Sequence, residues 1–336
     1  MTGRRSVVLA CTFLLALHLA ALTAGFLAPY SPTAQNRSFP YAPPTRLHVV
    51  DETGRLHLRP FVYALSDEGG VDAAYREDRR QAFPVRLLAR DEASGRLHLF
   101  GVDERARLFV LGSDGFGRDQ LSRLLHGARV SLLAGLLATA LSAGLGWMLG
   151  LVSGFYGRWL DALVMRAAEL FLAMPWLYLL FAVRAGLPLH VSAIQAFLLI
   201  VVVIGLVDWP RSARLVRGVA LSVRERNYVL AARGFGASDL HLLRSHIAPA
   251  TTGVVLTQAA LLVPQYILAE VTLSFLGLGV GEPVPSWGNM LTALQRYHVL
   301  SAYWWMWAPG VALVPVFLAY FVVSEALHDR VGSMSY

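Results

Sequence analysis

The sequence contains no lysine, because all 29 of its basic residues are arginines. This absence excludes chemistries that need a lysine amine, such as the Walker A phosphate loop and enzymes with a lysine nucleophile or base. Cysteine is nearly absent as well. The single one, Cys11, excludes an internal disulfide and a cysteine-based metal centre.

Charged residues are also scarce. They make up 15% of the 336 residues, whereas hydrophobic residues make up 56% and the mean hydropathy is +0.52. Soluble domains usually carry about 25% charged residues. The apolar excess is more than a water-soluble core requires and predicts a membrane protein. Its net charge of +7 comes entirely from arginine.

The first apolar stretch, residues 7–28, has no charged residue and follows Arg4 and Arg5. It is long enough to cross about 30 Å of hydrocarbon and longer than the apolar region of most signal peptides. We therefore expect a transmembrane helix over residues 1–29. The two arginines place its amino end in the cytoplasm.

Residues 30–111 have a different composition, with interspersed acids, arginines and turn residues. A partial repeat, Asp51–Leu58 and then Asp91–Leu99, combines an acidic turn containing glycine with an alternating stretch. This pattern is typical of β-hairpins. We expect a small, β-rich extracytoplasmic insertion, either a docking domain or a solvated insertion without a specific role.

The apolar pattern returns after residue 130 and gives five more spans, at 131–153, 160–183, 191–207, 251–273 and 303–326. The expected fold is an all-α polytopic membrane protein of about six helices. Its parts are an interfacial amphipathic segment at 112–130, a transmembrane domain at 131–328 and a cytoplasmic tail at 329–336. The arginine-rich connection at 211–250 stays inside, which agrees with cytoplasmic amino and carboxyl ends.

Within that connection, residues 227–240 predict two short helices joined at a glycine. Small residues there allow another protein's backbone to approach closely. Asp239 lies near the start of the second helix, where a carboxylate suits the helix dipole. An ordinary cytoplasmic linker is the alternative interpretation.

The same segment resembles the EAA signature of permeases from binding-protein-dependent ABC importers, which reads Glu-Ala-Ala, three residues, Gly, about ten residues and Ile-x-Pro. Leu230 stands at the glutamate position and Ala248 at the usual leucine. The matching positions are Ala231, Ala232, Gly236, Ile247 and Pro249.

Two further stretches narrow the resemblance to the C-type (DppC/OppC-like) subunit of dipeptide and oligopeptide permeases. Residues 112–129 resemble "GTDxxGRDxxSRLLYGAR", and residues 269–290 resemble "LSFLGLG…PxWG". The family-motif positions are Gly117, Arg118, Asp119, Ser274, Phe275, Gly277, Gly279, Trp287 and Gly288.

This resemblance implies a MetI-like permease core that forms half of a path for peptides or similar small solutes in the inner membrane. The implied partners are a second homologous permease (DppB/OppB-like), two cytoplasmic ABC ATPases that hold ATP and Mg, and an extracytoplasmic substrate-binding protein. No cofactor, catalytic activity or nucleic acid is expected on this chain. The implied ATPase-coupling residues are Tyr228, Ala231, Ala232, Arg233, Gly236, Ala237, Asp239, Ile247 and Pro249.

Glu270, in the fifth span, is a candidate pathway residue, since ionisable groups inside a membrane usually serve function. If the span ends early, Glu270 is interfacial instead. No metal site is expected, because His241 and His246 are poorly spaced for shared ligation.

Three other classes of function fit the sequence less well. A membrane-embedded enzyme lacks support, since neither His-Glu-x-x-His nor Gly-x-Ser-x-Gly occurs. An ion-driven secondary transporter remains the main alternative, although the spans show no clear repeat. ABC exporters commonly carry a fused ATPase domain, which the sequence does not contain. The substrate, whether a peptide, a nickel chelate, an opine or another solute, stays open.

Overall fold

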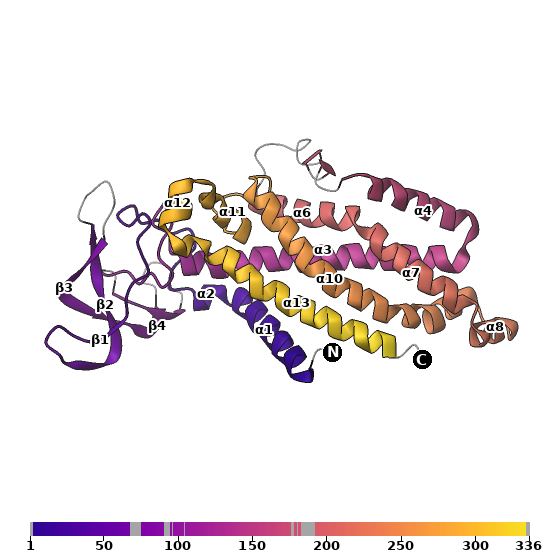
Figure 1. Ribbon diagram of the computed structural model, residues 1–336, viewed down its shortest axis with the longest axis horizontal. Helices are drawn as coiled ribbons and strands as arrows, with labels where there is room; N and C mark the ends of the chain where they lie inside the picture. The colour runs from indigo at the N-terminus through magenta and orange to yellow at the C-terminus, as the bar shows by residue number, and fades with distance from the viewer. Residues whose placement is uncertain are drawn as a thin grey trace. The chain divides into compact units, whose positions relative to one another are not determined.

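The computed structural model of the protein describes residues 3–67, 75–90, 95, 97–103, 105–175, 178–179, 181–182 and 192–333. The chain divides into two compact units (Figure 1), each built from separate stretches of sequence. Unit 1 comprises Met1–Leu14, Leu132–Thr272 and Val314–Tyr336, and unit 2 comprises Leu15–Ser131 and Leu273–Leu313.

Long helices dominate unit 1. Four of them extend beyond it into the sequence of unit 2: α1 (Arg4–Leu22), α3 (Gln120–Tyr156), α10 (Ala248–Phe275) and α13 (Ala308–Ser333). The others are α4 (Arg158–Ala173), α6 (Ala193–Val207), α7 (Trp209–Arg224), α8 (Asn227–Gly234), α9 (Asp239–Leu242) and a π-helical turn, η1 (Leu243–Ile247).

Glycines on one face of α3 let α7 pack unusually close within unit 1. Gly146, Gly150 and Gly154 recur every fourth residue and therefore share a face. A Cβ at Gly150 would lie 2.6 Å from the carbonyl oxygen of Ala213, and one at Gly154 would lie 2.7 Å from the Cβ of Ala220. Small residues at such crossings are typical of helix packing in membranes.

Among the described residues, five helical segments are long and apolar enough to cross a membrane: Arg4–Leu22, Gln120–Tyr156, Ala193–Arg224, Asp239–Phe275 and Trp304–Asp329. They contain five of the six expected spans. The expected span at 160–183 begins on α4, and several of its residues lie outside the described part of the chain. A mostly helical, polytopic fold is thus confirmed.

The connection expected at 211–250 is shorter than the charge pattern suggested. Residues 209–224 form α7, with Pro210 in its first turn, where proline is well tolerated because its N–H is not needed. Two of the arginines in α7 pair within unit 1, since Arg211 contacts Asp208 and Arg217 contacts Asp161. The non-helical connection therefore starts only at Glu225.

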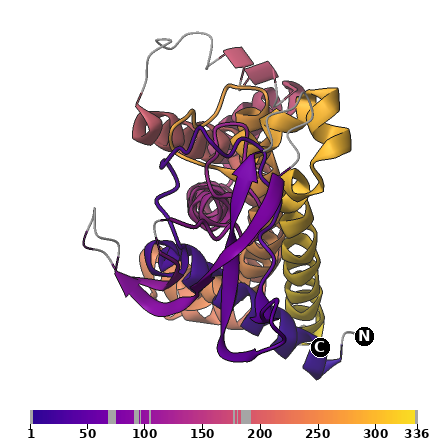
Figure 2. The same ribbon diagram turned by 90° about the vertical axis from the view of Figure 1, so that its left-hand side faces the viewer.

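Unit 2 contains the β-structure. Strands β1 (His48–Val50), β2 (Leu56–Asp67) and β3 (Tyr75–Pro84) form an antiparallel sheet in the order β1-β2-β3, which Figure 2 shows facing the viewer. Strands β4 (Arg86–Arg90) and β5 (Leu97–Gly101) pair separately. The short helices are α2 (Ala24–Leu27), α11 (Trp287–Leu291), η2 (Thr292–Gln295), α12 (Tyr297–Ala302) and η3 (Trp304–Trp307).

The β-rich region after the first helix is confirmed, and its first predicted hairpin has the expected turn. Asp51 Oδ1 accepts hydrogen bonds from the backbone N–H groups of Thr53 and Arg55, and Gly54 has φ +79°. The second copy of the repeat falls mostly on residues outside the described ranges, between the paired strands β4 and β5. The core is formed by Phe61, Val62 and their neighbours, whereas Leu58 is fully exposed.

The expectation of an interfacial amphipathic helix at 112–130 is wrong. Residues 120–130 are the first turns of α3, and residues 112–119 form a turn-rich lead-in. Arg118 and Asp119 are buried within unit 2 instead of lying at a surface. Arg118 can be buried because Asp114 and Glu282 pair with it, and one carboxylate oxygen of Asp119 accepts a backbone N–H. A single-helix view of the sequence does not reveal these partners.

Candidate functional site

The segment of unit 1 that resembles the EAA signature consists of α8, a glycine turn and α9. The N–H of Gly236 donates to the carbonyl of Arg233 at 3.0 Å, and the N–H of Ala237 donates to that of Ala232 at 3.1 Å. This bond pattern, with Gly236 at φ +89°, is a Schellman helix end, which requires a left-handed residue. Ser238 then caps α9, so the two predicted short helices are confirmed.

The inner face of this segment is fixed to unit 1. Val229, Leu242 and Ile247 have no exposed surface and belong to one apolar cluster with residues of α3 and α7. Ala232 and Ala237 pack against the same cluster. These two small residues therefore serve the protein's own core, while Ala231 and Gly236 are exposed.

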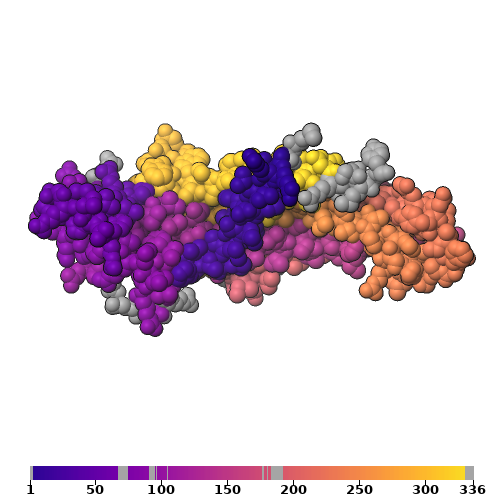
Figure 3. Space-filling view, turned by 90° about the horizontal axis from the view of Figure 1, so that it is seen from below, coloured from indigo at the N-terminus to yellow at the C-terminus, as the bar shows by residue number. Residues whose placement is uncertain are grey.

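The outer face carries exposed apolar side chains, of which Phe235 and Leu240 were not identified from the sequence. Phe235 is 92% exposed and Leu240 74% exposed, and Tyr228 and Leu230 are about half exposed. Figure 3 shows this segment, in orange, at the surface. Arg233 lies over the ring of Phe155, with its guanidinium carbon 5.5 Å from the ring centroid. Asp239 and Pro249 are exposed at the starts of α9 and α10.

The other sequence motifs meet in unit 2, starting with a tight turn before α3. Asp114 Oδ1 accepts hydrogen bonds from the N–H groups of Phe116 and Arg118. Gly117 has φ +68°, and a Cβ there would overlap the carbonyl oxygen of Asn36. Only glycine fits this position without moving the backbone.

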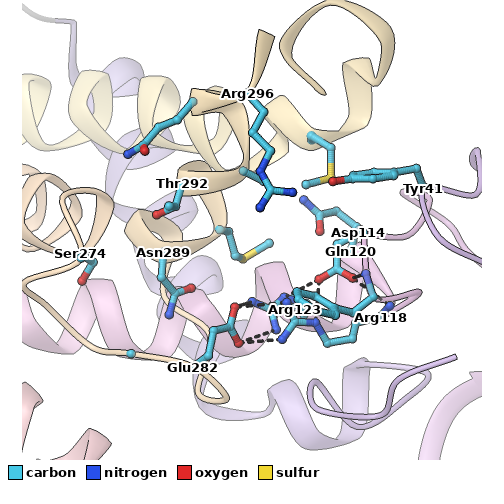
Figure 4. Close-up of a pocket in the computed structure, with 18 of the residues that line it drawn as sticks. Tyr41, Asp114, Arg118, Gln120, Arg123, Ser274, Glu282, Asn289, Thr292 and Arg296 are labelled. Atoms are coloured by element: carbon cyan, nitrogen blue, oxygen red, sulfur yellow. Dashed lines mark hydrogen bonds and ion pairs between the residues drawn. The ribbon is translucent and has the colours of Figure 1, made fainter. Parts of the chain in front are cut away.

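This turn aims Arg118 at a buried ion-pair cluster (Figure 4). Arg118 donates to Glu282 at 2.6 Å and to Asp114 at 2.7 Å, and Arg123 donates to Glu282 at 2.8 Å. The two arginine side chains and Asp114 are almost fully buried, whereas Glu282 is half-exposed. Burial alone would raise the pKa of Glu282, but the two guanidinium groups hold it below its usual value.

Asp119 follows in sequence and has a separate role. Its Oδ2 accepts a hydrogen bond from the N–H of Ser122 at 2.7 Å, which satisfies a free donor at the start of α3. Its Oδ1 has no hydrogen-bond partner among the described residues. Burial raises the pKa of Asp119 to about 7, because the charged form is poorly solvated there.

The second motif begins at the end of α10, and this helix terminates with the same hydrogen-bond pattern as α8. The N–H of Leu278 donates to the carbonyl of Leu273, and Gly277 has φ +76°. Ser274 Oγ accepts the N–H of Val280, and a Cβ at Gly279 would overlap that oxygen. The carbonyl of Phe275 accepts a hydrogen bond from the Gln295 side chain.

The last part of the second motif anchors α11 to α3 within unit 2. Ser286 and Asn289 form a reciprocal capping box at the start of α11. Trp287 is 1% exposed, and its indole Nε1 donates to the carbonyl of Leu124 at 3.0 Å. Gly288 is buried beside it. The two motif stretches, which are distant in sequence, thus form one compact structure.

A cavity of about 740 Å³ opens beside this structure, and all of its lining residues belong to unit 2. The lining residues that sequence reasoning missed include Tyr41, Gln120, Glu282 and Arg296. One sequence feature could have indicated this site: Glu282 is an acid in the glycine-rich connection that follows a membrane span. Nothing in the sequence identified its partners more than 150 positions earlier.

Glu270 has no exposed surface and lies inside α10, which continues to Phe275. The helix therefore continues past Glu270, and both interpretations of this residue, as a pathway residue and as an interfacial one, stay predictions. Within the described ranges, no group of three or more His, Cys, Asp or Glu side chains is arranged to hold a metal ion.

These features define a class of protein. Membrane-length helices and a two-helix segment with an apolar outer face fit a transport permease. Residues 146–333, more than half of the chain, match the family described as binding-protein-dependent transport system inner membrane component. The chain belongs to this family and is a multi-pass membrane component of an ABC importer.

Several relatives are similar in sequence to about two thirds of the chain. A protein of Brucella ovis named as a peptide permease is 40% identical over 219 residues, which are 65% of this chain and 70% of that protein. A Brucella suis protein named as a peptide transport system permease is 39% identical over 66% of this chain and 72% of its own length. The dipeptide transport system permease protein DppC of Alkalihalophilus pseudofirmus is 36% identical over 65% of this chain and 69% of its own.

Proposed function

We propose that this chain is one of two permeases in an importer of short peptides and that its α8–α9 segment is the docking site for a cytoplasmic ATPase. The peptide substrate is supported by the names of the relatives, which include peptide and dipeptide permeases. The remaining partners would be a second homologous permease, a second ATPase and an extracytoplasmic binding protein. ATP and Mg would be bound by the ATPases.

The observation that carries the docking proposal is the two-sided character of the α8–α9 segment. Its outer face exposes Phe235 and Leu240 to solvent, which is costly unless a partner covers them. Its inner face buries Val229, Leu242 and Ile247 against α3 and α7. A packed core moves as a unit, so a displacement of the outer face would be passed on to these helices.

Leu230 adds a chemical detail to this interface. It stands where the family signature has glutamate, and it is about half exposed on the outer face. We propose that its contact with the ATPase is apolar, not ionic. Arg233 and its neighbouring exposed arginines would contribute orientation and association rate more than affinity.

The orientation of the chain follows from the same proposal. A cytoplasmic α8–α9 segment places the amino and carboxyl ends in the cytoplasm and the β-rich residues 30–111 outside. Arg4 and Arg5 at the first span agree with this topology.

The first experiment is affinity purification of the tagged protein from membranes, with identification of the proteins that remain bound. The proposal expects a second permease and Walker-motif ATPases. Recovery of the chain alone, or as a homo-oligomer without an ATPase, would contradict it and favour a transporter driven by an ion gradient.

A second experiment tests the docking face itself. Gly236→Trp adds bulk where a Cβ meets nothing within 4 Å, and its left-handed backbone should cost only about 1 kcal/mol, so the subunit should still fold. In the reconstituted transporter, ATP hydrolysis should no longer drive uptake. Gly218→Trp is the matched control, because Gly218 of α7 is also exposed and open. Normal transport by the Gly236→Trp protein would refute the docking assignment.

A further inference from the structure

The cavity of unit 2 has the size and walls of a small-molecule site. Its volume of about 740 Å³ falls within the roughly 300–1,000 Å³ that ligand pockets usually have. The apolar part of its wall includes the buried side chains of Val280, Met290 and Met306. Methionine side chains adapt to ligands of different shape because they are flexible and polarizable.

Two of the three arginines in the cavity wall form ion pairs with acidic side chains. Arg118 and Arg123 are paired with Asp114 and Glu282. Arg296 is a third arginine in the wall, and the structure shows no ion pair for it within the described part of the chain. Its guanidinium group reaches into the cavity towards Tyr41 (Figure 4), the hydroxyl of which it influences electrostatically.

A second donor, without a partner among the described residues, faces the same space. Gln120 lines the cavity at the start of α3 and is only 1% exposed. Its Nε2 has no hydrogen-bond partner among the described residues. A buried amide without a partner is costly, typically about 1–3 kcal/mol, so its presence points to a ligand that accepts a hydrogen bond.

We propose that this cavity is a carboxylate-binding site for the free carboxyl end of the transported peptide, held by Arg296 and Gln120. A carboxylate only accepts hydrogen bonds and matches the planar donor pair of a guanidinium group. The adaptable methionine wall accommodates varied peptide side chains. The identity of the ligand rests on the proposed peptide function, whereas the preference for a carboxylate rests on the two donors.

The test measures binding of alanyl-alanine to the complete transporter in nanodiscs without its binding protein. Arg296→Gln should weaken binding at least about tenfold, since it removes a charge-assisted hydrogen bond. Alanyl-alanine amide should bind the wild type and this variant equally weakly. Arg37→Gln is the matched control, because Arg37 is an exposed arginine of unit 2 outside the cavity wall, and it should leave binding unchanged.

Gln120→Leu removes the second donor at similar volume and breaks no hydrogen bond of Nε2 that the structure shows. It should weaken binding of the acid several-fold while the fold is kept. Unchanged binding in both the Arg296 and Gln120 variants would overturn the carboxylate site. So would equal binding of acid and amide by the wild type.

ATP-driven uptake of alanyl-alanine with the binding protein present separates the two proposals. Uptake by the wild type together with unaltered binding in the variants would overturn only the carboxylate site. If the wild type fails to take up the dipeptide, the proposed peptide function fails. Acid-selective binding that depends on Arg296 would in that case still identify a carboxylate site for another solute.

Discussion

The α8–α9 segment of unit 1 and the motif cluster of unit 2 contain the same type of helix end in different surroundings. Gly236 and Gly277 both end a helix with a left-handed residue and the same pair of backbone hydrogen bonds. Around Gly236 the space is open and the neighbouring Phe235 is exposed. Around Gly277 the space is open too, but the chain that follows leads to Glu282, which pairs with the buried Arg118 and Arg123. The same helix end therefore occurs in the proposed docking segment and beside a buried ion-pair cluster, and the residues that follow it make the difference.

The largest loss of stability should come from adding a side-chain atom at Gly117 of unit 2, where the Asn36 carbonyl occupies the space. Gly117→Ala combines a φ of +68° with overlap of the Asn36 carbonyl and should destabilise the protein by at least about 4 kcal/mol. Thermal unfolding in detergent and the yield of monodisperse protein would measure this. A variant that unfolds like the wild type would show that the turn is less tightly packed than the structure indicates.

The second-largest loss of stability should come from removing the charge of Glu282, which pairs with both arginines of the buried cluster. Glu282→Gln leaves Arg118 and Arg123 buried with only Asp114, which should cost about 2–3 kcal/mol. This is less than for a fully buried pair because Glu282 is half-exposed. The matched control is Glu169→Gln in unit 1, since its partner Arg166 is 81% exposed, and the expected change is below about 0.5 kcal/mol. Equal losses of thermal stability in the two variants would contradict this difference.

Asp119 should make the stability of unit 2 depend on pH. Its pKa is about 7 in the folded protein and 3.8 ordinarily, so the folded state binds the proton more tightly. The contribution to stability is full below pH 4 and is lost as the pH rises to 7. Asp119→Asn keeps the helix cap and should remove this loss, on the order of 2 kcal/mol between pH 5 and pH 8. Parallel pH profiles of unfolding for the two proteins would refute the raised pKa.

The smallest loss of stability should come from replacing Gly236, which has open space around it. Gly236→Ala must place a non-glycine residue at φ +89° but meets no atom within 4 Å, so the expected cost is about 1 kcal/mol. Measured beside Gly117→Ala, it gives the part of the penalty that is due to backbone conformation alone. A loss as large as that of Gly117→Ala would mean that unit 1 is also tightly packed at this turn.

The general fold could be predicted from sequence because it depends on long local patterns. Uncharged apolar runs mark the helices, and the acidic glycine turn at Asp51–Arg55 marks a hairpin. The boundaries were less predictable. Arginines at 211–224 suggested a loop, yet they lie on α7, where Arg217 finds Asp161 as a partner. A charge that is paired across helices looks the same in sequence as a charge exposed to water.

The sequence by itself determined that the chain spans a membrane, has no lysine for a Walker A loop and carries three family motifs in order. These conclusions follow from composition and from local spacing. Only the tertiary structure decided that Arg118 and Arg123 share Glu282 and that Gln120 and Arg296 face one cavity. Contacts over such separations depend on how the helices and loops pack, which no local pattern of residues encodes.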